Sequence, residues 1–213
     1  MRTIAFTHPK KWDDPAEYSY IVRHQELSGI PVCKDKDFDL YGQCWSMNKS
    51  CDGLWRTYTN NKQKLAVQVQ STVGSLLKAY ASRHKEILGH LFCGKVVYES
   101  TEKLQRANKD SKPSSLQKEM DSLFYKRKDF AYEQEVRLVV NIMPKSQNIF
   151  ENASKVRASQ YALFLFDDLK WIDRCVVSPW ASPMEVAMVQ TLSNFSGIQS
   201  KCVMKSDLYD EWR

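Results

Sequence analysis

The sequence contains little glycine and little proline, with only 7 of each among 213 residues. Collagen-like chains and disordered linkers need far more of both, so these classes are excluded. No apolar run approaches the roughly 18–20 residues that span a bilayer. The first residues also lack the apolar stretch and the small-residue cleavage site of a signal peptide. We therefore expect a cytoplasmic protein without a membrane partner.

Closely spaced metal ligands are also missing from the sequence. Its 6 cysteines and 4 histidines are scattered, and none forms a zinc-type pair. We expect reduced, mostly buried thiols and no metal site. There is no glycine-rich phosphate loop and no nucleophile elbow, which excludes P-loop and α/β-hydrolase enzymes.

The remaining composition is that of a globular protein with a mildly basic surface. Hydrophobic residues make up 43%, and 31 Lys+Arg against 25 Asp+Glu leave a net charge of +6. The length suits one domain, residues 1–213, with a sizeable core. The basic stretches 109–112 and 126–128 would neutralise phosphates, so nucleic acid is an expected partner.

Strand-like and helix-like segments interleave irregularly along the chain. Apolar alternation and β-branched composition predict strands at 4–9, 40–46, 65–72, 91–100, 135–142, 161–166, 171–179 and 200–206. Helical spacing and capping residues predict helices at 16–26, 73–88, 113–124 and 183–196. Polar composition predicts loops at 28–39, 101–114 and 144–159. The pattern indicates a single α+β domain with a mixed, mostly antiparallel sheet and about four helices.

The sharpest chemical signal is the segment Glu133-Gln134-Glu135. Two carboxylates at positions i and i+2 of an extended segment project to the same face, where each raises the pKa of the other. Such a pair can hold a hydroxyl or stabilise a cationic centre. The alternative is a pair of solvated charges on an exposed edge strand, with Arg137 as a neighbour on the same face.

A second cluster combines aromatic, basic and hydroxyl side chains at Ser46, Trp55, Arg56 and Tyr58. An arginine between two aromatic rings can bind phosphate while the rings stack on a base or on nicotinamide. The alternative is that the rings anchor the core and Arg56 is a surface charge. Ser71 either offers its hydroxyl to a ribose or helps to cap the following helix.

A third cluster holds three acids, Asp13, Asp14 and Glu17. Carboxylates at this density can bind a divalent metal, which raises the possibility of a nuclease. Helix capping by these acids is the simpler interpretation, because no lysine follows the Glu133/Glu135 pair as a metal nuclease would require.

Five motifs occur in a characteristic order. They are FTHPKKWDDPAE (6–17), YGQCWS (41–46), DGLWRTYTNNKQKLAVQVQST (52–72), VVYES (96–100) and KRKDFAYEQEVRLVV (126–140). The series resembles the bacterial family catalogued as domain of unknown function 2971. The resemblance spans roughly residues 4–140, and residues 141–213 supply C-terminal strands and a helix of the same domain. The layout of that family looks like the split sheet of ADP-ribosyltransferases, which use NAD as a substrate.

The resemblance implies roles for the two glutamates. Glu135 would bind the nicotinamide-ribose hydroxyl and favour an oxocarbenium-like transition state, while Glu133 would orient the acceptor. Ser71 or Ser46 would support the carboxylate.

The resemblance also implies how NAD is held. Arg56 would contact its phosphates, and Tyr58 or Trp55 would stack on nicotinamide. Family members usually carry a further strand and helix before the Asp-Pro box, and in the transferases the first strand often supplies a cofactor-binding Arg or His. In this chain Arg2, His8 or Arg56 would have to take that place, or another chain would supply the strand.

Three functions follow as hypotheses. The first is an ADP-ribosyltransferase-like enzyme that modifies a nucleic acid or a protein, acting as a bacterial toxin or anti-phage effector with an antitoxin or another defence-system subunit as partner. The second is a non-catalytic module that binds nucleic acid or protein on the same fold. The third is a metal-dependent nuclease built on the acidic residues.

Overall fold

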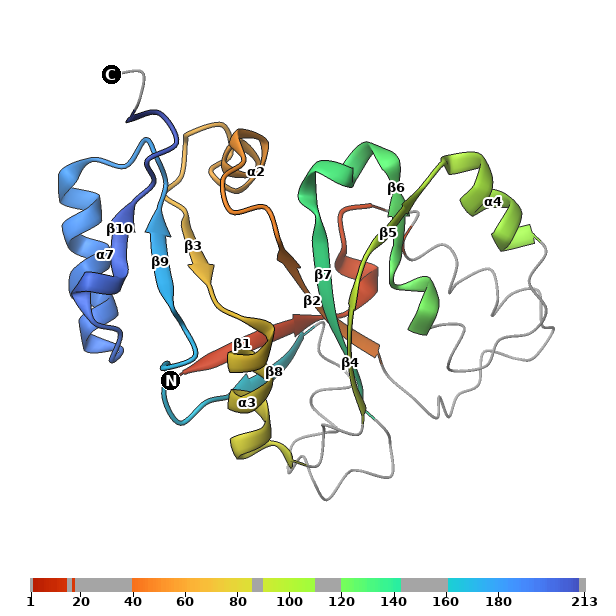
Figure 1. Cartoon of the computed structure of the whole chain (residues 1–213), viewed down its shortest axis with the longest axis horizontal. Helices are drawn as coiled ribbons and strands as arrows, with labels where there is room; N and C mark the ends of the chain where they lie inside the picture. The colour runs from red at the N-terminus through yellow and green to blue at the C-terminus, as the bar shows by residue number, and fades with distance from the viewer. Residues whose placement is uncertain are drawn as a thin grey trace. The chain divides into compact units, whose positions relative to one another are not determined.

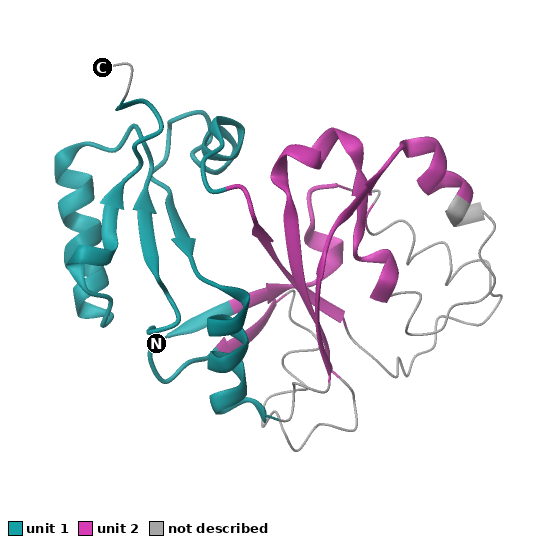
Figure 2. Cartoon of the chain, in the orientation of Figure 1, with its two compact units in different colours: residues 1–4, 49–85, 165–213 teal, residues 5–48, 86–164 magenta. Residues whose placement is uncertain are grey.

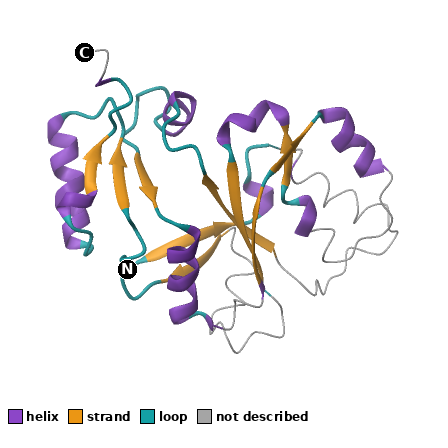
Figure 3. Ribbon diagram, in the orientation of Figure 1, coloured by secondary structure: helices purple, strands orange, loops and turns teal. Residues whose placement is uncertain are grey.

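The computed structural model describes residues 2–14, 17, 40–85, 90–109, 120–142 and 161–210 (Figure 1). The predicted loops 28–39 and 144–159 lie outside these residues, and so do most of the predicted helices 16–26 and 113–124. The described part is an α+β structure with mostly antiparallel sheets, as predicted (Figure 3). Among these residues no helix has both the length and the apolar character needed to cross a bilayer.

The largest sheet has five strands in the order β4-β7-β2-β1-β8. The strands are β1 (Thr3–Thr7), β2 (Leu40–Ser46), β4 (Leu91–Lys95), β7 (Glu135–Asn141) and β8 (Tyr161–Leu165). Strand β7 pairs antiparallel with β2 on one side and with β4 on the other. It is buried along its whole length, as expected for a central strand rich in valine and leucine.

Two smaller sheets are found among the described residues. In one, β9 (Arg174–Val177) lies between the parallel β10 (Val203–Lys205) and the antiparallel β3 (Val67–Gln70). In the other, β5 (Val97–Glu99) pairs in parallel with β6 (Tyr125–Arg127). The single strand predicted at 91–100 is therefore divided at Val96 into β4 and β5, which belong to different sheets.

The α-helices of the described residues are α2 (Asp52–Tyr58), α3 (Val73–Arg83), α4 (Thr101–Lys109) and α7 (Pro183–Phe195). Short 3-10 helices are η1 (Pro9–Lys11), η3 (Lys128–Glu133) and η5 (Ser200–Cys202). The prediction of α7 is confirmed, including the capping box of Ser182 and Glu185. Helix α3 begins at Val73 as predicted but ends at Arg83, five residues before the predicted end, because the chain leaves helical geometry at His84.

Helix α4 corrects the prediction of a loop at 101–114. Its polar sequence consists largely of good helix formers, and an i, i+4 ion pair joins Lys103 Nζ to Glu99 Oε1 at 2.5 Å. The Ser100 hydroxyl also accepts a hydrogen bond from the Lys103 backbone N–H. Polarity alone had suggested a loop, whereas propensity and capping favour the helix.

Contacts group the chain into two compact units (Figure 2). The first comprises residues 1–4, 49–85 and 165–213, and the second comprises residues 5–48 and 86–164. Each is assembled from segments far apart in the sequence. That the whole chain is one domain stays a prediction.

The core of the second unit lies against one face of the large sheet. It contains Leu40, Met120, Leu123 and Val139, with Trp12 and Phe124 packed against them. Two strand glycines make room for these rings: a Cβ at Gly42 would lie 2.4 Å from Trp12, and one at Gly94 would lie 3.0 Å from Phe124. The close approach of the rings brings η1 and residues 120–124 down onto the sheet, beside the first residues of β7.

Candidate functional site: a buried cluster of carboxylates and cations

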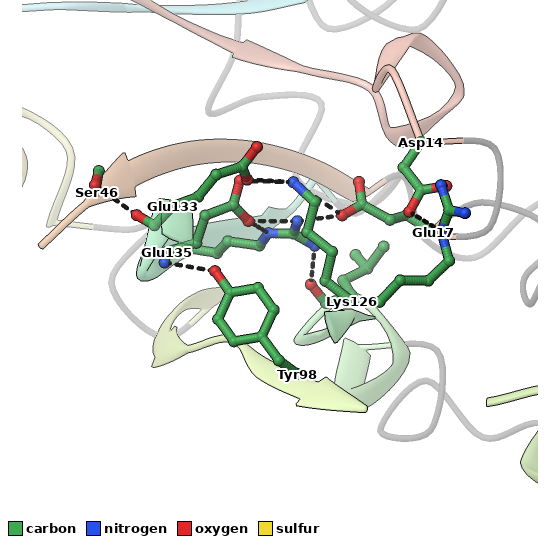
Figure 4. Close-up of polar contacts among 10 residues, drawn as sticks. Asp14, Glu17, Ser46, Tyr98, Lys126, Glu133 and Glu135 are labelled. Atoms are coloured by element: carbon green, nitrogen blue, oxygen red, sulfur yellow. Dashed lines mark hydrogen bonds and ion pairs between the residues drawn. The ribbon is translucent and has the colours of Figure 1, made fainter. Parts of the chain in front are cut away.

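The two glutamates of the sharpest motif sit where helix η3 passes into strand β7. Glu133 is the last residue of η3, Gln134 has a left-handed φ of 46°, and Glu135 begins β7. The segment is therefore not extended, which corrects the premise of the prediction. The two carboxylates nevertheless turn toward the same partner, because the left-handed residue redirects the chain between them (Figure 4).

That partner is Lys126 on β6, whose side chain is only 9% exposed. Its Nζ lies 2.5 Å from Glu133 Oε2, 3.2 Å from Glu135 Oε1 and 3.6 Å from Glu17 Oε1. One ammonium group thus faces three carboxylates. Because Lys126 is buried on β6 and not exposed at the surface, its ammonium group acts as a shared counter-ion for these carboxylates.

Arg137 is the second cation of the cluster and is fully buried. Its guanidinium contacts Glu135 Oε2 at 2.5 and 2.8 Å and Glu17 Oε1 at 2.5 Å. A further N–H donates to the Leu123 carbonyl at 2.6 Å, and the indole of Trp12 lies 4.4 Å from the guanidinium carbon. Such complete pairing is what allows an arginine to remain charged in a core. The alternative of solvated charges on an edge strand is therefore wrong.

The acidic residues of the N-terminal motif join the same region without forming a cluster of their own. Asp14 makes a bidentate pair with Arg127, at 3.0 Å for each bond, while Glu17 contacts Arg137 and Lys126. Both carboxylates are thus compensated by basic side chains. In the described part of the chain no three His, Cys, Asp or Glu side chains are grouped so that they could hold a metal ion.

The environment separates the ionisation of the two glutamates. Burial raises the pKa of Glu133, although its bond to Lys126 acts in the opposite direction. Burial alone would also raise the pKa of Glu135, but the charges of Arg137 and Lys126 outweigh it and lower that pKa. Glu135 is therefore the more persistent anion, and Glu133 takes up a proton more readily.

The cations are stabilised in their charged form. Burial by itself would lower the pKa of Lys126, but the bond to Glu133 and the charges of Glu17 and Glu135 raise it. Burial also raises the pKa of Glu17, against the pull of Arg137. Three carboxylates thus face two cations, which leaves the cluster with one negative charge in excess when all five groups are ionised.

Ser46 lies directly opposite Glu135 in the β2–β7 register. Its hydroxyl donates to the Glu133 carbonyl at 2.5 Å and accepts from the Asn48 backbone N–H at 3.0 Å. The resemblance implied that Ser46 supports a carboxylate, whereas here it holds the backbone that carries one. The Met47 N–H adds a bond to the Gln134 carbonyl at 2.9 Å, so the end of β2 fixes the turn.

Tyr98 on β5 borders the cluster and was not identified as a site residue from the sequence. Its phenol oxygen accepts a hydrogen bond from the Glu135 backbone N–H at 2.8 Å. Burial raises the pKa of Tyr98, so the phenol keeps its proton. The feature of the sequence that could have indicated Tyr98 as a site residue is its place in the VVYES motif.

The predicted nicotinamide and phosphate contacts lie in the first unit, each in its own local setting. Arg56 pairs with Asp52 at 2.6 Å, and Trp55 is buried. Tyr58 is 72% exposed at the end of α2. Ser71 donates its hydroxyl to the Trp171 carbonyl at 2.5 Å. Their roles toward NAD stay predictions.

His8 lies beside Tyr41 on β2, far along that strand from Ser46, which faces Glu135. It follows β1, its ring contacts that of Tyr41 at 5.6 Å, and its Nδ1 accepts from the Lys10 N–H at 3.2 Å. Tyr41 is five positions from Ser46 along β2, or about 17 Å at strand spacing. The structure thus brings Ser46, Glu133 and Glu135 together and leaves His8 apart.

The chain was compared with protein-family models, with curated proteins and with solved structures. None of the three comparisons finds a match. The resemblance to the domain of unknown function 2971 family therefore stays a prediction, and the cluster itself carries the functional argument.

The sequence indicated the two glutamates but not the cations that organise them. Lys126 and Arg127 belong to a basic run that composition assigned to an exposed patch for phosphates. The structure instead buries Lys126 and pairs Arg127 with Asp14. Arg137, two residues after Glu135, could have been recognised as a partner only with the knowledge that β7 is central.

Proposed function

We propose that this protein is an NAD-consuming, ADP-ribosyltransferase-like enzyme whose reaction centre is the Glu133/Glu135 cluster. The observation that carries the proposal is geometric: both carboxylates share Lys126 at the start of a central strand, directly beside Ser46 on the paired strand. The finer fold, a split sheet of the ADP-ribosyltransferase type, and membership of the family named above belong to the same proposal.

The separated ionisation of the two carboxylates suits this chemistry. Glu135 remains an anion and would oppose the positive charge that develops on the ribose as the bond to nicotinamide breaks. Glu133 has the raised pKa of a proton acceptor and would take the proton from the acceptor group as that group bonds to the ribose. Lys126 would keep both carboxylates in position during these steps.

The acceptor would be a nucleic acid or a protein. The net charge of +6 favours an anionic acceptor. The resemblance extends the proposal to a toxin or anti-phage effector that is held inactive by a partner subunit.

The test is transfer of label from NAD by the purified protein, with nucleic acid and with cell extract as acceptors. Glu135→Gln preserves size and removes the anion, and we expect at least a hundredfold loss of transfer. Glu102→Gln makes the same chemical change at the exposed start of α4 and should leave transfer unchanged. Equal transfer by Glu135→Gln and by the unaltered protein would overturn the assignment.

A second candidate function is favoured by the saturation of Glu135, because both of its oxygens are paired with cations. In that case the cluster stabilises the fold, and the chain is a non-catalytic module that binds nucleic acid. Salt-sensitive retention on nucleic acid without any consumption of NAD would support it. A linear fall of log affinity with log salt is the expected signature.

A further inference from the structure

Helix α7 exposes a row of large apolar side chains. Met184, Met188, Leu192 and Phe195 are 83%, 48%, 59% and 85% exposed, and their spacing places them along one side of the helix. We call these four residues the α7 ridge. Glu185 is the one charged residue in the sequence of α7.

The opposite side of α7 is apolar as well. Val189 is buried in the core that joins α7 to β9 and β10, and Val186 packs against the same core. Gln190, Thr191 and Asn194 make the rest of α7 polar, and an apolar side of a helix normally packs against another element. Among the described residues of the first unit, the core covers the inner side of α7 and the ridge stays exposed, which favours a partner that binds the ridge.

We infer that the occupant is the α7 ridge of a second copy of this chain, which forms a symmetric dimer. From their exposed fractions, the four side chains present roughly 500 Å² of apolar surface, which is in the upper part of the range for the largest patch on a monomer, and such patches are often functional. Two ridges together would bury about 1,000 Å², the lower limit for a specific interface. An isologous contact uses the same patch on both copies, so it needs no partner of different chemistry.

The charges around the helix favour an antiparallel arrangement of the two copies. Glu185 lies in the first turn of α7, while Arg2 donates from Nε to the Ser196 carbonyl at the other end, and Lys201 follows in η5. A twofold axis would therefore bring the acidic end of one helix toward the basic end of the other. The two helix dipoles would also run in opposite directions.

The same symmetry specifies which ridge residues meet. If the twofold axis crosses α7 at the level of Gln190, Met188 of one copy faces Leu192 of the other. Met184 then faces Phe195. Methionine at two of the four positions allows the ridges to interdigitate without a fixed shape. The buried area is small, so the dimer should dissociate at a concentration on the order of 10 µM.

The first experiment is sedimentation equilibrium of the full chain from about 1 to about 500 µM. We expect the mean mass to rise from 24.8 kDa toward twice that value. Leu192→Glu should weaken association at least tenfold, because it brings a charge into the apolar contact. Leu163→Glu is the matched control, since Leu163 on β8 is also 59% exposed, and it should associate as the unaltered chain does.

A second experiment tests the antiparallel register. Met188→Lys and Leu192→Glu should each be monomeric at 50 µM, and an equimolar mixture should regain the dimer. In the mixed dimer the lysine introduced at position 188 of one copy faces the glutamate introduced at position 192 of the other. The second contact between these positions, related to the first by the twofold axis, remains Met188 against Leu192. Circular dichroism confirms that each variant is folded.

Several outcomes would overturn the inference. They are an unaltered chain that stays at 24.8 kDa at every concentration, association of Leu192→Glu equal to that of the unaltered chain, or loss of association in Leu163→Glu. A mixture that remains monomeric would overturn the antiparallel arrangement. None of these results depends on NAD turnover.

Discussion

Replacement of Arg137 by methionine is the most direct test of the buried cluster. Methionine keeps most of the length of the side chain and removes the charge together with the N–H donors. In the native protein this guanidinium is fully buried and compensates both Glu135 and Glu17. The variant leaves Lys126 as the one cation of the cluster facing three carboxylates.

The expected loss of stability is large. Removal of one partner from a buried ion pair destabilises a protein by about 3–5 kcal/mol, because the remaining charge stays without compensation. The hydrogen bond to the Leu123 carbonyl and the contact with Trp12 are lost as well. Since the whole free energy of unfolding of such a chain is about 5–15 kcal/mol, the variant should be close to unfolding at 37 °C.

Urea unfolding at 25 °C and pH 7, followed by circular dichroism, measures this loss. Arg56→Met is the control, because the Arg56–Asp52 pair is 44% exposed on both sides and its removal should change the midpoint too little to resolve. Equal midpoints for the two variants would refute the view that the cluster supports the fold.

The pH dependence of the variant provides a separate check. Without Arg137 the pKa of Glu135, now lowered by that arginine, should move above its unfolded value. A carboxylate with a raised folded pKa contributes stability that is present below the unfolded pKa and is lost as pH rises through the folded value. The difference between Arg137→Met and the native protein should therefore be smaller at pH 5 than at pH 7.

Further predictions concern the packing and ionisation of the site. Gly42→Ala should destabilise by about 1–3 kcal/mol in urea unfolding, because its Cβ would displace Trp12, whereas Gly74→Ala in α3 meets open space and should stabilise by about 0.5 kcal/mol. Label transfer from NAD should rise with pH as Glu133 ionises, at a higher pH than for an ordinary glutamate because burial raises its pKa, and Glu133→Gln should abolish this rise. Lys126→Met should move this rise in transfer to higher pH, because it removes the cation that favours ionised Glu133. A rise at unchanged pH would show that another group controls it.

Local signals in the sequence predicted several elements well. Strand β2 was expected at 40–46 and is observed at Leu40–Ser46, and the cap of α7 was read from Ser182, Pro183 and Glu185. Such features depend on residues within one turn or on the period of a single strand. The residues that determine such an element are neighbours in the sequence, so a local pattern is enough to predict it.

The features that could not be predicted from the sequence depend on contacts between residues far apart in the chain. The Arg127–Asp14 pair joins positions 113 residues apart, and the Arg137–Glu17 pair joins positions 120 apart. No periodicity in a single sequence indicates such pairing. The left-handed Gln134 is a second case. Its N–H donates to the Ala131 carbonyl where η3 ends, and Ser46 holds the neighbouring Glu133 carbonyl.

The charge balance of the cluster limits the part of a ligand that it can accept. Lys126 and Arg137 are already committed to carboxylates, and when all five groups are ionised the cluster carries one excess negative charge, which would repel a phosphate. Hydroxyl groups are different, because a carboxylate such as Glu133 accepts their hydrogen bonds without loss of its own charge. The cluster therefore suits a ribose and not a pyrophosphate. In the proposed reaction with NAD, cations outside the cluster would hold the phosphates of the dinucleotide, so loss of those cations should raise KM while Glu135→Gln lowers kcat.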